Sequence, residues 1–320
     1  MKPTVLITRQ IPDVATKLLK SVVDIDQWTK ESPMPRHVLL DKVRHATAIL
    51  PCLTEKIDST VFAASPQLKV VANFAVGYDN IDLEAARRHN VVVTNTPGVL
   101  TEAVAEHTVA LMFAVARQIV AGDQFVRAGK YEYWLPMGFL GPQLWGKTLG
   151  VVGLGRIGGW VAQIAAGGLR MKVIYSSPER DEDLEFRLGI KRHELDVVLK
   201  ESDIVSIHVP LMPLTHHLIG KRELKLMKPS AYLINTSRGP VVDEAALIEA
   251  LENKTIAGAG LDVYEHEPKI PSALRKLPNV VLTPHIASST VEARNAMAEI
   301  AAKNILAVLA GKAPLNPVKG

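Results

Sequence analysis

Short apolar runs alternate with amphipathic segments along the first hundred residues. The runs are continuous rather than alternating in polarity, which is typical of parallel strands buried on both faces. We expect strands at residues 5–7, 48–50, 70–73 and 91–94, and helices at 13–19, 35–43, 58–64 and 83–88. This order of elements favours an α/β fold built on a parallel sheet.

A second series of the same kind begins at Thr148. Before it lie an Ala-rich helix, expected over 101–119, and a turn-rich segment, 122–146, which is long for a passive loop. Further strands are expected at 148–152, 172–175, 204–208, 231–235, 258–263 and 280–283, with helices at 243–251 and 290–309. Two series in a chain of 320 residues predict two domains.

The composition narrows the class of protein. Apolar residues make up 48% of the chain and charged residues 22%, as in ordinary globular proteins. The net charge of +4 is spread without a basic run, which indicates attraction for anionic metabolites and no nucleic-acid partner. The single cysteine, Cys52, excludes an internal disulfide and a cysteine-based zinc cluster, and no metal site is expected.

Apolar runs are too short for a membrane span or a signal peptide, so we expect a cytoplasmic protein without a membrane partner.

A glycine-rich motif follows the first strand of the second series. It consists of Gly153, Leu154, Gly155, Arg156, Ile157 and Gly158, and it opens an amphipathic helix. In this context the first glycine permits a tight turn, the second lets the backbone approach a pyrophosphate, and the third lets helix and strand pack closely. The motif therefore predicts a dinucleotide-binding site at a helix N-terminus.

The end of the next strand bears on the choice of dinucleotide. An Asp or Glu usually stands there in NAD sites, but this chain has Ser176 and Ser177. Two hydroxyls can bond a 2′-phosphate and Arg180 can neutralise it, whereas Glu179 would repel it if it turned inward. We favour NADP(H) over NAD(H). The alternative is that Arg180 is a solvated surface charge and that both cofactors bind.

Three chemically distinctive residues follow later strands. Arg238, Glu267 and His285 each come after a predicted parallel strand, where open α/β sheets place their ligands. A guanidinium offers the planar fork that matches a carboxylate, an imidazole can deliver a proton, and a neighbouring carboxylate stabilises the imidazolium. These are the groups that reduction of a 2-keto acid needs.

With these motifs the chain resembles the D-isomer-specific 2-hydroxyacid dehydrogenase family over essentially its full length. The matching segments are 153–158, 235–239, 260–268 and 283–285. Segments 76–82, 96–101, 134–136 and 146–150 are similar to those of glyoxylate/hydroxypyruvate reductases within that family. One departure is Ser177, because reductases of this subgroup often carry an arginine immediately after the serine.

The resemblance implies an architecture. It predicts two doubly wound α/β domains, in which a Rossmann-type dinucleotide-binding domain, 99–286, is inserted in a flavodoxin-like substrate domain made of 1–98 and 287–320. It also implies a homodimer formed through the nucleotide domain, with the loop around Trp134 reaching toward the partner. Because Trp134 stands in a long segment rich in glycine and proline, we expect it to limit substrate size; the alternative is that it is a buried anchor of its loop.

The resemblance also implies roles by position. His285 matches the general acid, Glu267 its partner and Arg238 the anchor of the substrate carboxylate. Val76 and Gly77 match backbone donors to the same carboxylate, and Leu100 matches a residue that lines the pocket. Positions around the nicotinamide are matched by Thr236, Ser237, Asp262 and Ala287.

Together these observations predict an enzyme that reduces a short 2-keto acid, glyoxylate or hydroxypyruvate, to the D-2-hydroxy acid. Hydride comes from NAD(P)H and the proton from His285. One alternative is a phosphoglycerate dehydrogenase or another D-2-hydroxyacid dehydrogenase. Another is a nucleotide-sensing, corepressor-like binding protein, against which the intact Arg238, Glu267 and His285 argue.

Overall fold

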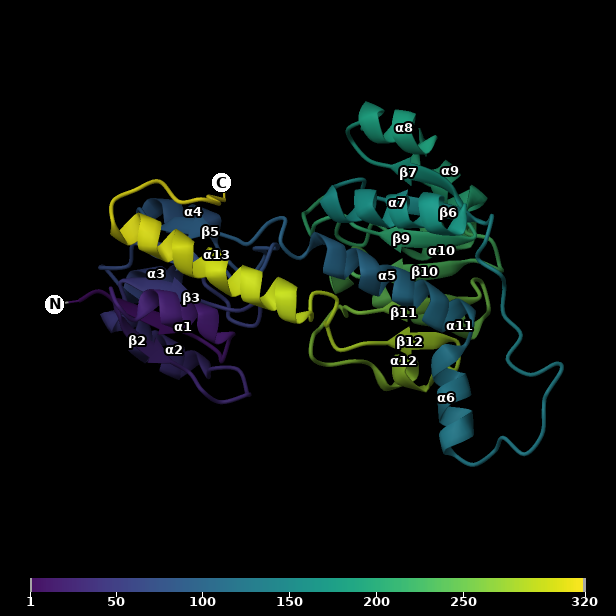
Figure 1. The fold of residues 1–320 in the computed structure, drawn as a ribbon, viewed down its shortest axis with the longest axis horizontal. Helices are drawn as coiled ribbons and strands as arrows, with labels where there is room; N and C mark the ends of the chain where they lie inside the picture. The colour runs from purple at the N-terminus through teal and green to yellow at the C-terminus, as the bar shows by residue number, and fades with distance from the viewer. Residues whose placement is uncertain (1, 319–320) are drawn as a thin grey trace. The chain divides into compact units, whose positions relative to one another are not determined.

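The structure is a computed structural model that describes residues 2–318 (Figure 1). The chain forms two compact units: one comprises the residues up to Leu100 together with those from Ser289 onward, and the other is Thr101–Ser288. Each unit contains one sheet whose strands are all parallel. The expected α/β class with two parallel sheets is confirmed.

The first unit has a five-stranded sheet in the order β2-β1-β3-β4-β5, which is the flavodoxin-like order. Its strands are β1 (Thr4–Ile7), β2 (Asp24–Gln27), β3 (Ala48–Leu50), β4 (Val70–Ala72) and β5 (Val92–Thr94). Its helices are α1 (Asp13–Leu19), α2 (Arg36–Lys42), α3 (Ser59–Ala64), α4 (Leu83–Arg88) and α13 (Val291–Leu309), with a 3-10 turn, η1 (Val43–His45). Helices α1 and α13 pack side by side, so the last helix of the chain completes this unit (Figure 1).

The second unit has a seven-stranded sheet in the order β12-β11-β10-β9-β6-β7-β8. Its strands are β6 (Thr148–Val152), β7 (Lys172–Ser176), β8 (Lys191–Arg192), β9 (Ile204–Ile207), β10 (Tyr232–Asn235), β11 (Gly258–Leu261) and β12 (Val280–Leu282). From β6 onward this is the 3-2-1-4-5-6 order of a Rossmann fold with one further strand, and the chain reverses direction across the sheet between β6 and β9. The crevice for a dinucleotide therefore belongs at the carboxyl ends of β6 and β9.

Helices cover both faces of the seven-stranded sheet. They are α5 (Thr101–Ala116), α6 (Ile119–Arg127), α7 (Arg156–Leu169), α8 (Glu182–Leu188), α9 (Leu195–Glu201), α10 (Lys221–Leu226), α11 (Glu244–Glu252) and α12 (Ser272–Lys276), with a 3-10 turn, η2 (Gly239–Val241). One apolar core lies under α5 and α7, and another lies under α9, α10 and α11. Aspartate side chains at Asp181 and Asp243 cap α8 and α11 by accepting from free backbone amides of the first turn.

The structure differs from the sequence-based expectation around Gly122. The predicted helix 101–119 ends at Ala116, and Gln118 adopts a left-handed conformation with a φ of 51° before α6 begins. Gly122 therefore lies inside α6 and not in a turn. The polar strand β2 and the two-residue strand β8 were not predicted, because edge strands need no continuous apolar run.

Within residues 2–318, no single helix is long and apolar enough to span a membrane. Helices α5 and α6 meet the length and composition criteria only as a pair, and this pair is bent by 63°.

Candidate active site

The glycine-rich turn has the geometry that phosphate binding requires. Gly153 adopts a φ of 95°, and a Cβ there would lie 2.9 Å from the backbone of His208 at the end of β9. A Cβ on Gly158 would lie 2.2 Å from the carbonyl oxygen of Gly153, so α7 packs directly on the turn. A Cβ on Gly155 would meet nothing within 4 Å, and this residue caps the start of α7. The turn therefore leaves open space at a helix N-terminus, where a pyrophosphate fits.

The end of β7 carries the residues that bear on the 2′-position of the ribose. Ser176 and Ser177 are partly buried there. The guanidinium of Arg180, however, is directed to α8, where its Nε lies 3.1 and 3.2 Å from the carboxylate oxygens of Glu185. Arg192 on β8 was not predicted. Its Nε donates to the carbonyl oxygen of Ser177 at 2.7 Å, so it places a second guanidinium beside this strand end.

The Arg238 turn is organised by Asn235 at the end of β10. The buried Asn235 carboxamide accepts from the amide of Ser237 at 3.0 Å and donates to the carbonyl of Arg238 at 3.0 Å. Gly239 then packs against the segment after β11, because a Cβ there would lie 1.9 Å from the backbone of Tyr264. Glycine is therefore required here for the close approach of another backbone segment.

Glu267 and His285 form a direct pair. One carboxylate oxygen of Glu267 lies 2.8 Å from Nδ1 of His285, and the other accepts from the backbone amide of Tyr264 at 3.0 Å. His285 follows β12 and has a left-handed backbone with a φ of 55°, which is uncommon for a residue other than glycine. The side chain of His285 is 29% exposed. With Nδ1 bound to Glu267, Nε2 is the ring nitrogen left to serve a substrate.

Asp262 holds the backbone on which His285 lies. Its carboxylate is fully buried and accepts from the amides of Ile286 and Ala287, both at 2.8 Å, and its own carbonyl accepts from the amide of His285 at 2.9 Å. Burial raises the pKa of Asp262, but hydrogen bonds from His107, Thr283 and the two amides outweigh it, so that the net pKa lies below the ordinary value. Asp262 is therefore an ionised anchor of the His285 loop.

The remaining predicted residues fall in three places. Thr236 is buried and its hydroxyl lies 2.8 Å from that of Thr108 on α5. Trp134 lies in the segment after α6 and is 77% exposed. Val76, Gly77 and Leu100 belong to the five-stranded unit, where Leu100 is buried.

Three other histidines have structural partners. Burial lowers the pKa of His208 to about 3, so its ring is neutral, and its Nε2 lies 2.8 Å from the hydroxyl of Ser206. His217 contacts Glu265 at 2.8 Å and stacks on His216 with ring centroids 4.0 Å apart. The side-chain nitrogen and oxygen atoms of His216, His217 and Glu265 that could bind a metal ion lie within 4.8 Å of one another. The two histidine rings, however, stack on each other. We interpret the contact between His217 and Glu265 as structural: it connects the loop of His217 to the segment that carries Glu267.

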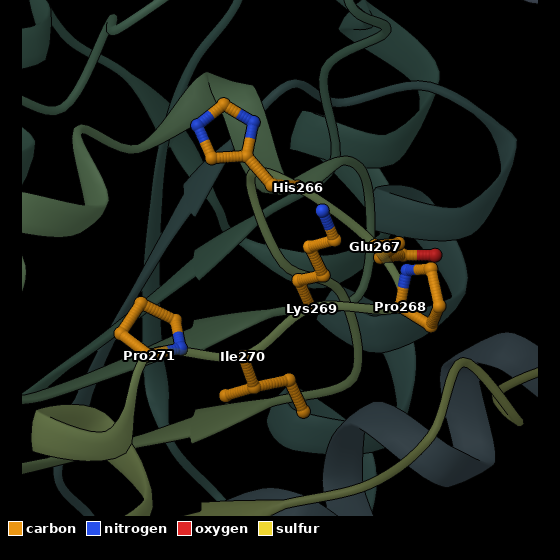
Figure 2. A pocket seen from close by; sticks show the side chains of 6 residues that line it. All are labelled: His266, Glu267, Pro268, Lys269, Ile270 and Pro271. Atoms are coloured by element: carbon orange, nitrogen blue, oxygen red, sulfur yellow. The ribbon is translucent and has the colours of Figure 1, made fainter.

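A pocket of about 670 Å³ lies beside Glu267. Figure 2 shows its lining, which consists of His266, Glu267, Pro268, Lys269, Ile270 and Pro271. All six residues come from one segment after β11, and neither Arg238 nor His285 lines the pocket. We therefore place the candidate active site at the carboxyl ends of the strands and not in this pocket.

Sequence reasoning missed several residues of the site. Asn235 could have been found, since an asparagine at the start of a turn commonly bonds to the backbone two residues on. Arg192 carries no local signal, because it reaches Ser177 only through the pairing of β8 with β7. Tyr264 was likewise missed, although its amide holds Glu267 and its hydroxyl donates to the carbonyl of Thr283 at 2.9 Å.

Arg238, Glu267 and His285 follow β10, β11 and β12, which are adjacent parallel strands, so all three lie at the same edge of the sheet. The glycine turn lies at that edge too, after β6. A Rossmann sheet with these groups at its carboxyl edge defines an NAD(P)-dependent dehydrogenase.

Comparison with known proteins gives the particular family. The sequence model described as "D-isomer specific 2-hydroxyacid dehydrogenase, NAD binding domain" matches residues 109–287. The chain belongs to the D-isomer specific 2-hydroxyacid dehydrogenase family, as its sequence motifs predicted.

Several relatives match over nearly their whole length. A glyoxylate reductase of Thermococcus litoralis is 51% identical over 99% of this chain and 97% of its own, and one of Pyrococcus furiosus is 49% identical over 98% and 94%. Among solved structures, an NADPH-dependent glyoxylate/hydroxypyruvate reductase of Sinorhizobium meliloti, in complex with NADP and malonate, is 34% identical. Its TM-score is 0.87, with 99% of this chain and 97% of that chain covered.

Proposed function

We propose that the protein reduces glyoxylate or hydroxypyruvate to the corresponding 2-hydroxy acid, with D configuration where the product is chiral. The observation that carries the proposal is the 2.8 Å contact between His285 Nδ1 and Glu267 at the edge that also carries Arg238. The full-length similarity to glyoxylate reductases supports the choice of substrate. In this proposal the five-stranded unit is the substrate domain and Thr101–Ser288 is the dinucleotide-binding domain.

Different residues of the chain have different roles in the proposed reduction. When bound, the reduced nicotinamide supplies the hydride that attacks the keto carbon. His285 donates the proton from Nε2 to the keto oxygen, which completes the hydroxyl group, while Glu267 keeps the ring oriented and stabilises its protonated form. Arg238 binds the substrate carboxylate through its planar fork. The amides of Val76 and Gly77 are proposed as further donors to that carboxylate, with Leu100 lining the pocket.

The dinucleotide is held by residues that fit its parts. Gly153 to Gly158 receive the pyrophosphate, with the N-terminus of α7 directed at it. Thr236, Ser237, Asp262 and Ala287 are proposed around the nicotinamide, where Asp262 acts through the backbone it holds.

A substrate panel run with NADH and with NADPH tests this function. We expect turnover of glyoxylate and hydroxypyruvate at rates well above those of bulkier 2-keto acids. Preferential turnover of a phosphorylated three-carbon keto acid would instead indicate a phosphoglycerate dehydrogenase. Binding of dinucleotide without turnover of any 2-keto acid would indicate the nucleotide-sensing alternative.

NADP(H) is the proposed preferred cofactor, because no carboxylate stands at Ser176 to repel a 2′-phosphate. We expect kcat/KM to be higher with NADPH than with NADH, and Ser176→Asp to reverse that preference. The structure offers two arginines that could bind the 2′-phosphate. Arg180 is paired with Glu185, whereas Arg192 contacts the Ser177 carbonyl. Steady-state kinetics of Arg180→Ala and Arg192→Ala with both cofactors will show which guanidinium binds the 2′-phosphate. A wild-type enzyme that clearly prefers NADH would contradict the assignment.

A homodimer formed through the nucleotide domain is proposed from the segment around α6. This helix has no buried residue, and Ile119, Val126, Trp134 and Met137 of α6 and the following loop are each more than half exposed. Figure 1 shows α6 and this loop projecting from the end of α5 beyond the seven-stranded sheet of the same unit. Such an apolar surface fits a second copy of the chain.

Trp134 is the residue proposed to limit substrate size from across that dimer. We expect Trp134→Ala to relax the preference for short acids by about tenfold in the ratio of kcat/KM values, since a lost aromatic wall admits longer side chains. The measurement is the substrate panel together with sedimentation velocity on the same sample. An unchanged preference with only a lower Tm would show that Trp134 merely anchors its loop.

A further inference from the structure

His107 is a partly buried histidine on α5 that contacts the loop carrying His285. Its side chain is 19% exposed, and its Nε2 lies 3.1 Å from the hydroxyl oxygen of Thr283, the first residue after β12. The same nitrogen lies 3.5 Å from a carboxylate oxygen of Asp262, the first residue after β11. A helix that precedes the seven-stranded sheet in the sequence is therefore bonded to the carboxyl ends of two of its strands.

The hydrogens of this contact follow from the chemistry of the three groups. The Thr283 hydroxyl donates its one hydrogen to the Asp262 carboxylate at 2.6 Å, because an ionised carboxylate can only accept. The Thr283 oxygen is thus the acceptor toward His107, which must carry a hydrogen on Nε2. The result is a chain of hydrogen bonds in which His107 donates to Thr283 and Thr283 donates to Asp262.

This chain of hydrogen bonds ends on the group that holds the backbone around His285. The Asp262 carboxylate accepts from the amides of the two residues after His285, each at 2.8 Å. Burial raises the pKa of Asp262, and the hydrogen bond from His107 is the largest of the contacts that lower it. His107 therefore helps to keep the anchor of the loop ionised and able to accept from both amides.

The loop needs support because its backbone is strained. A φ of 55° at His285 is unfavourable for a residue other than glycine and persists only where the surroundings enforce it. Within residues 2–318, the other side chains that hydrogen-bond to residues 283–287 are Asp262, Tyr264 and Glu267, which all belong to one segment after β11. His107 adds a contact from α5, which packs against β10, β11 and β12.

We infer that His107 is a positioning residue for the reduction: through Thr283 and Asp262 it holds the His285 loop in the conformation from which Nε2 of His285 protonates the substrate. His107 acts on the alignment of the general acid and does not touch the reacting atoms. A reacting group displaced by about 1 Å can lower a rate about 100-fold, so a partial loosening has a measurable effect. This inference rests on the proposed function and adds to it a residue from α5.

The test compares two substitutions of His107 in the full-length enzyme. Leucine has no donor, whereas glutamine places an N–H near the position of Nε2. With enzyme in excess over NADPH and with glyoxylate saturating, we expect NADPH oxidation to slow about tenfold in His107→Leu and to stay within about threefold of wild type in His107→Gln. The solvent isotope effect on this rate should rise in His107→Leu alone, because a misaligned acid slows proton transfer.

Thr283→Val interrupts the same chain of hydrogen bonds at its middle, and it provides the test if His107→Leu does not fold. It should slow NADPH oxidation to a similar extent, about tenfold. When both substitutions are combined, the rate should equal that of the slower single variant, since either one breaks the chain. Multiplied effects would show that the two residues act independently and would contradict the inference.

Hydrogen–deuterium exchange provides a measurement that needs no turnover. The amides of residues 285–287 should exchange faster in His107→Leu than in the wild type, while those of β9 and β10 should be unchanged. The control is His89→Leu, which alters an exposed histidine stacked on Phe62 in the five-stranded unit and should change neither the rate nor the exchange.

A folded His107→Leu enzyme with the wild-type rate, isotope effect and exchange would overturn the inference. Faster exchange throughout the sheet with an unchanged isotope effect would also overturn it, because His107 would then only stabilise the fold. A wild-type enzyme without glyoxylate turnover would instead defeat the proposed function. Exchange at residues 285–287 would still decide whether His107 holds this loop.

Discussion

His285→Ala is expected to lower kcat for glyoxylate about 10²- to 10⁴-fold at neutral pH, the range typical for loss of a general acid. The reason is geometric: Nδ1 is bound to Glu267, so Nε2 is the nitrogen that can protonate the keto oxygen. The affinity for NADPH should persist, because the pyrophosphate site lies after β6 and not after β12. Stopped-flow turnover and a fluorescence titration of NADPH measure the two quantities separately.

The matched control for this variant is His216→Ala. His216 is exposed, stacks on His217 and has no proposed role in the reaction, so its removal should leave kcat unaltered. Near-wild-type turnover by His285→Ala at neutral pH would remove His285 from the mechanism. A loss of both NADPH binding and turnover would show that the substitution disturbs the loop held by Asp262.

Arg238→Lys is expected to lower kcat/KM for glyoxylate about 10- to 100-fold, with most of the change in KM. Lysine keeps the positive charge but cannot present two parallel donors to a carboxylate, and the loss of a charge-assisted hydrogen bond has about this effect. The side chain is partly buried after β10, on a turn fixed by Asn235, so the shorter reach of lysine cannot be recovered by movement of the backbone. Initial rates over a range of glyoxylate concentrations at saturating NADPH give the measurement.

Arg222→Lys is the control for this second substitution. Arg222 is an exposed arginine that pairs with Asp196 on α9 and Glu223 on α10, and it has no proposed role in the reaction. Unchanged kinetics in Arg238→Lys across the substrate panel would show that another group binds the carboxylate. The backbone amides of Val76 and Gly77 would then be the candidates for that role.

Much of the fold could be predicted from local patterns. Continuous apolar runs identified β1, the strands from β3 to β7 and those from β9 to β12, because a strand buried on both faces must be apolar throughout. The edge strands β2 and β8 escaped this rule, since one side of each faces solvent or polar side chains. The α5–α6 break was missed because it depends on the left-handed conformation of Gln118, for which the sequence offers no glycine.

The sequence by itself determined the chemical identity of the site: a glycine turn after a strand, and an arginine, a glutamate and a histidine after three later strands. These are local features, encoded by periodicity and by residue type at a strand end. Only the tertiary structure decided how they act together. Strand order made β10, β11 and β12 neighbours, packing brought Glu267 within 2.8 Å of His285, and the pairing of β8 with β7 placed Arg192 beside Ser177. Such contacts join residues far apart in the chain, and they arise from the burial of two sheets rather than from any local pattern.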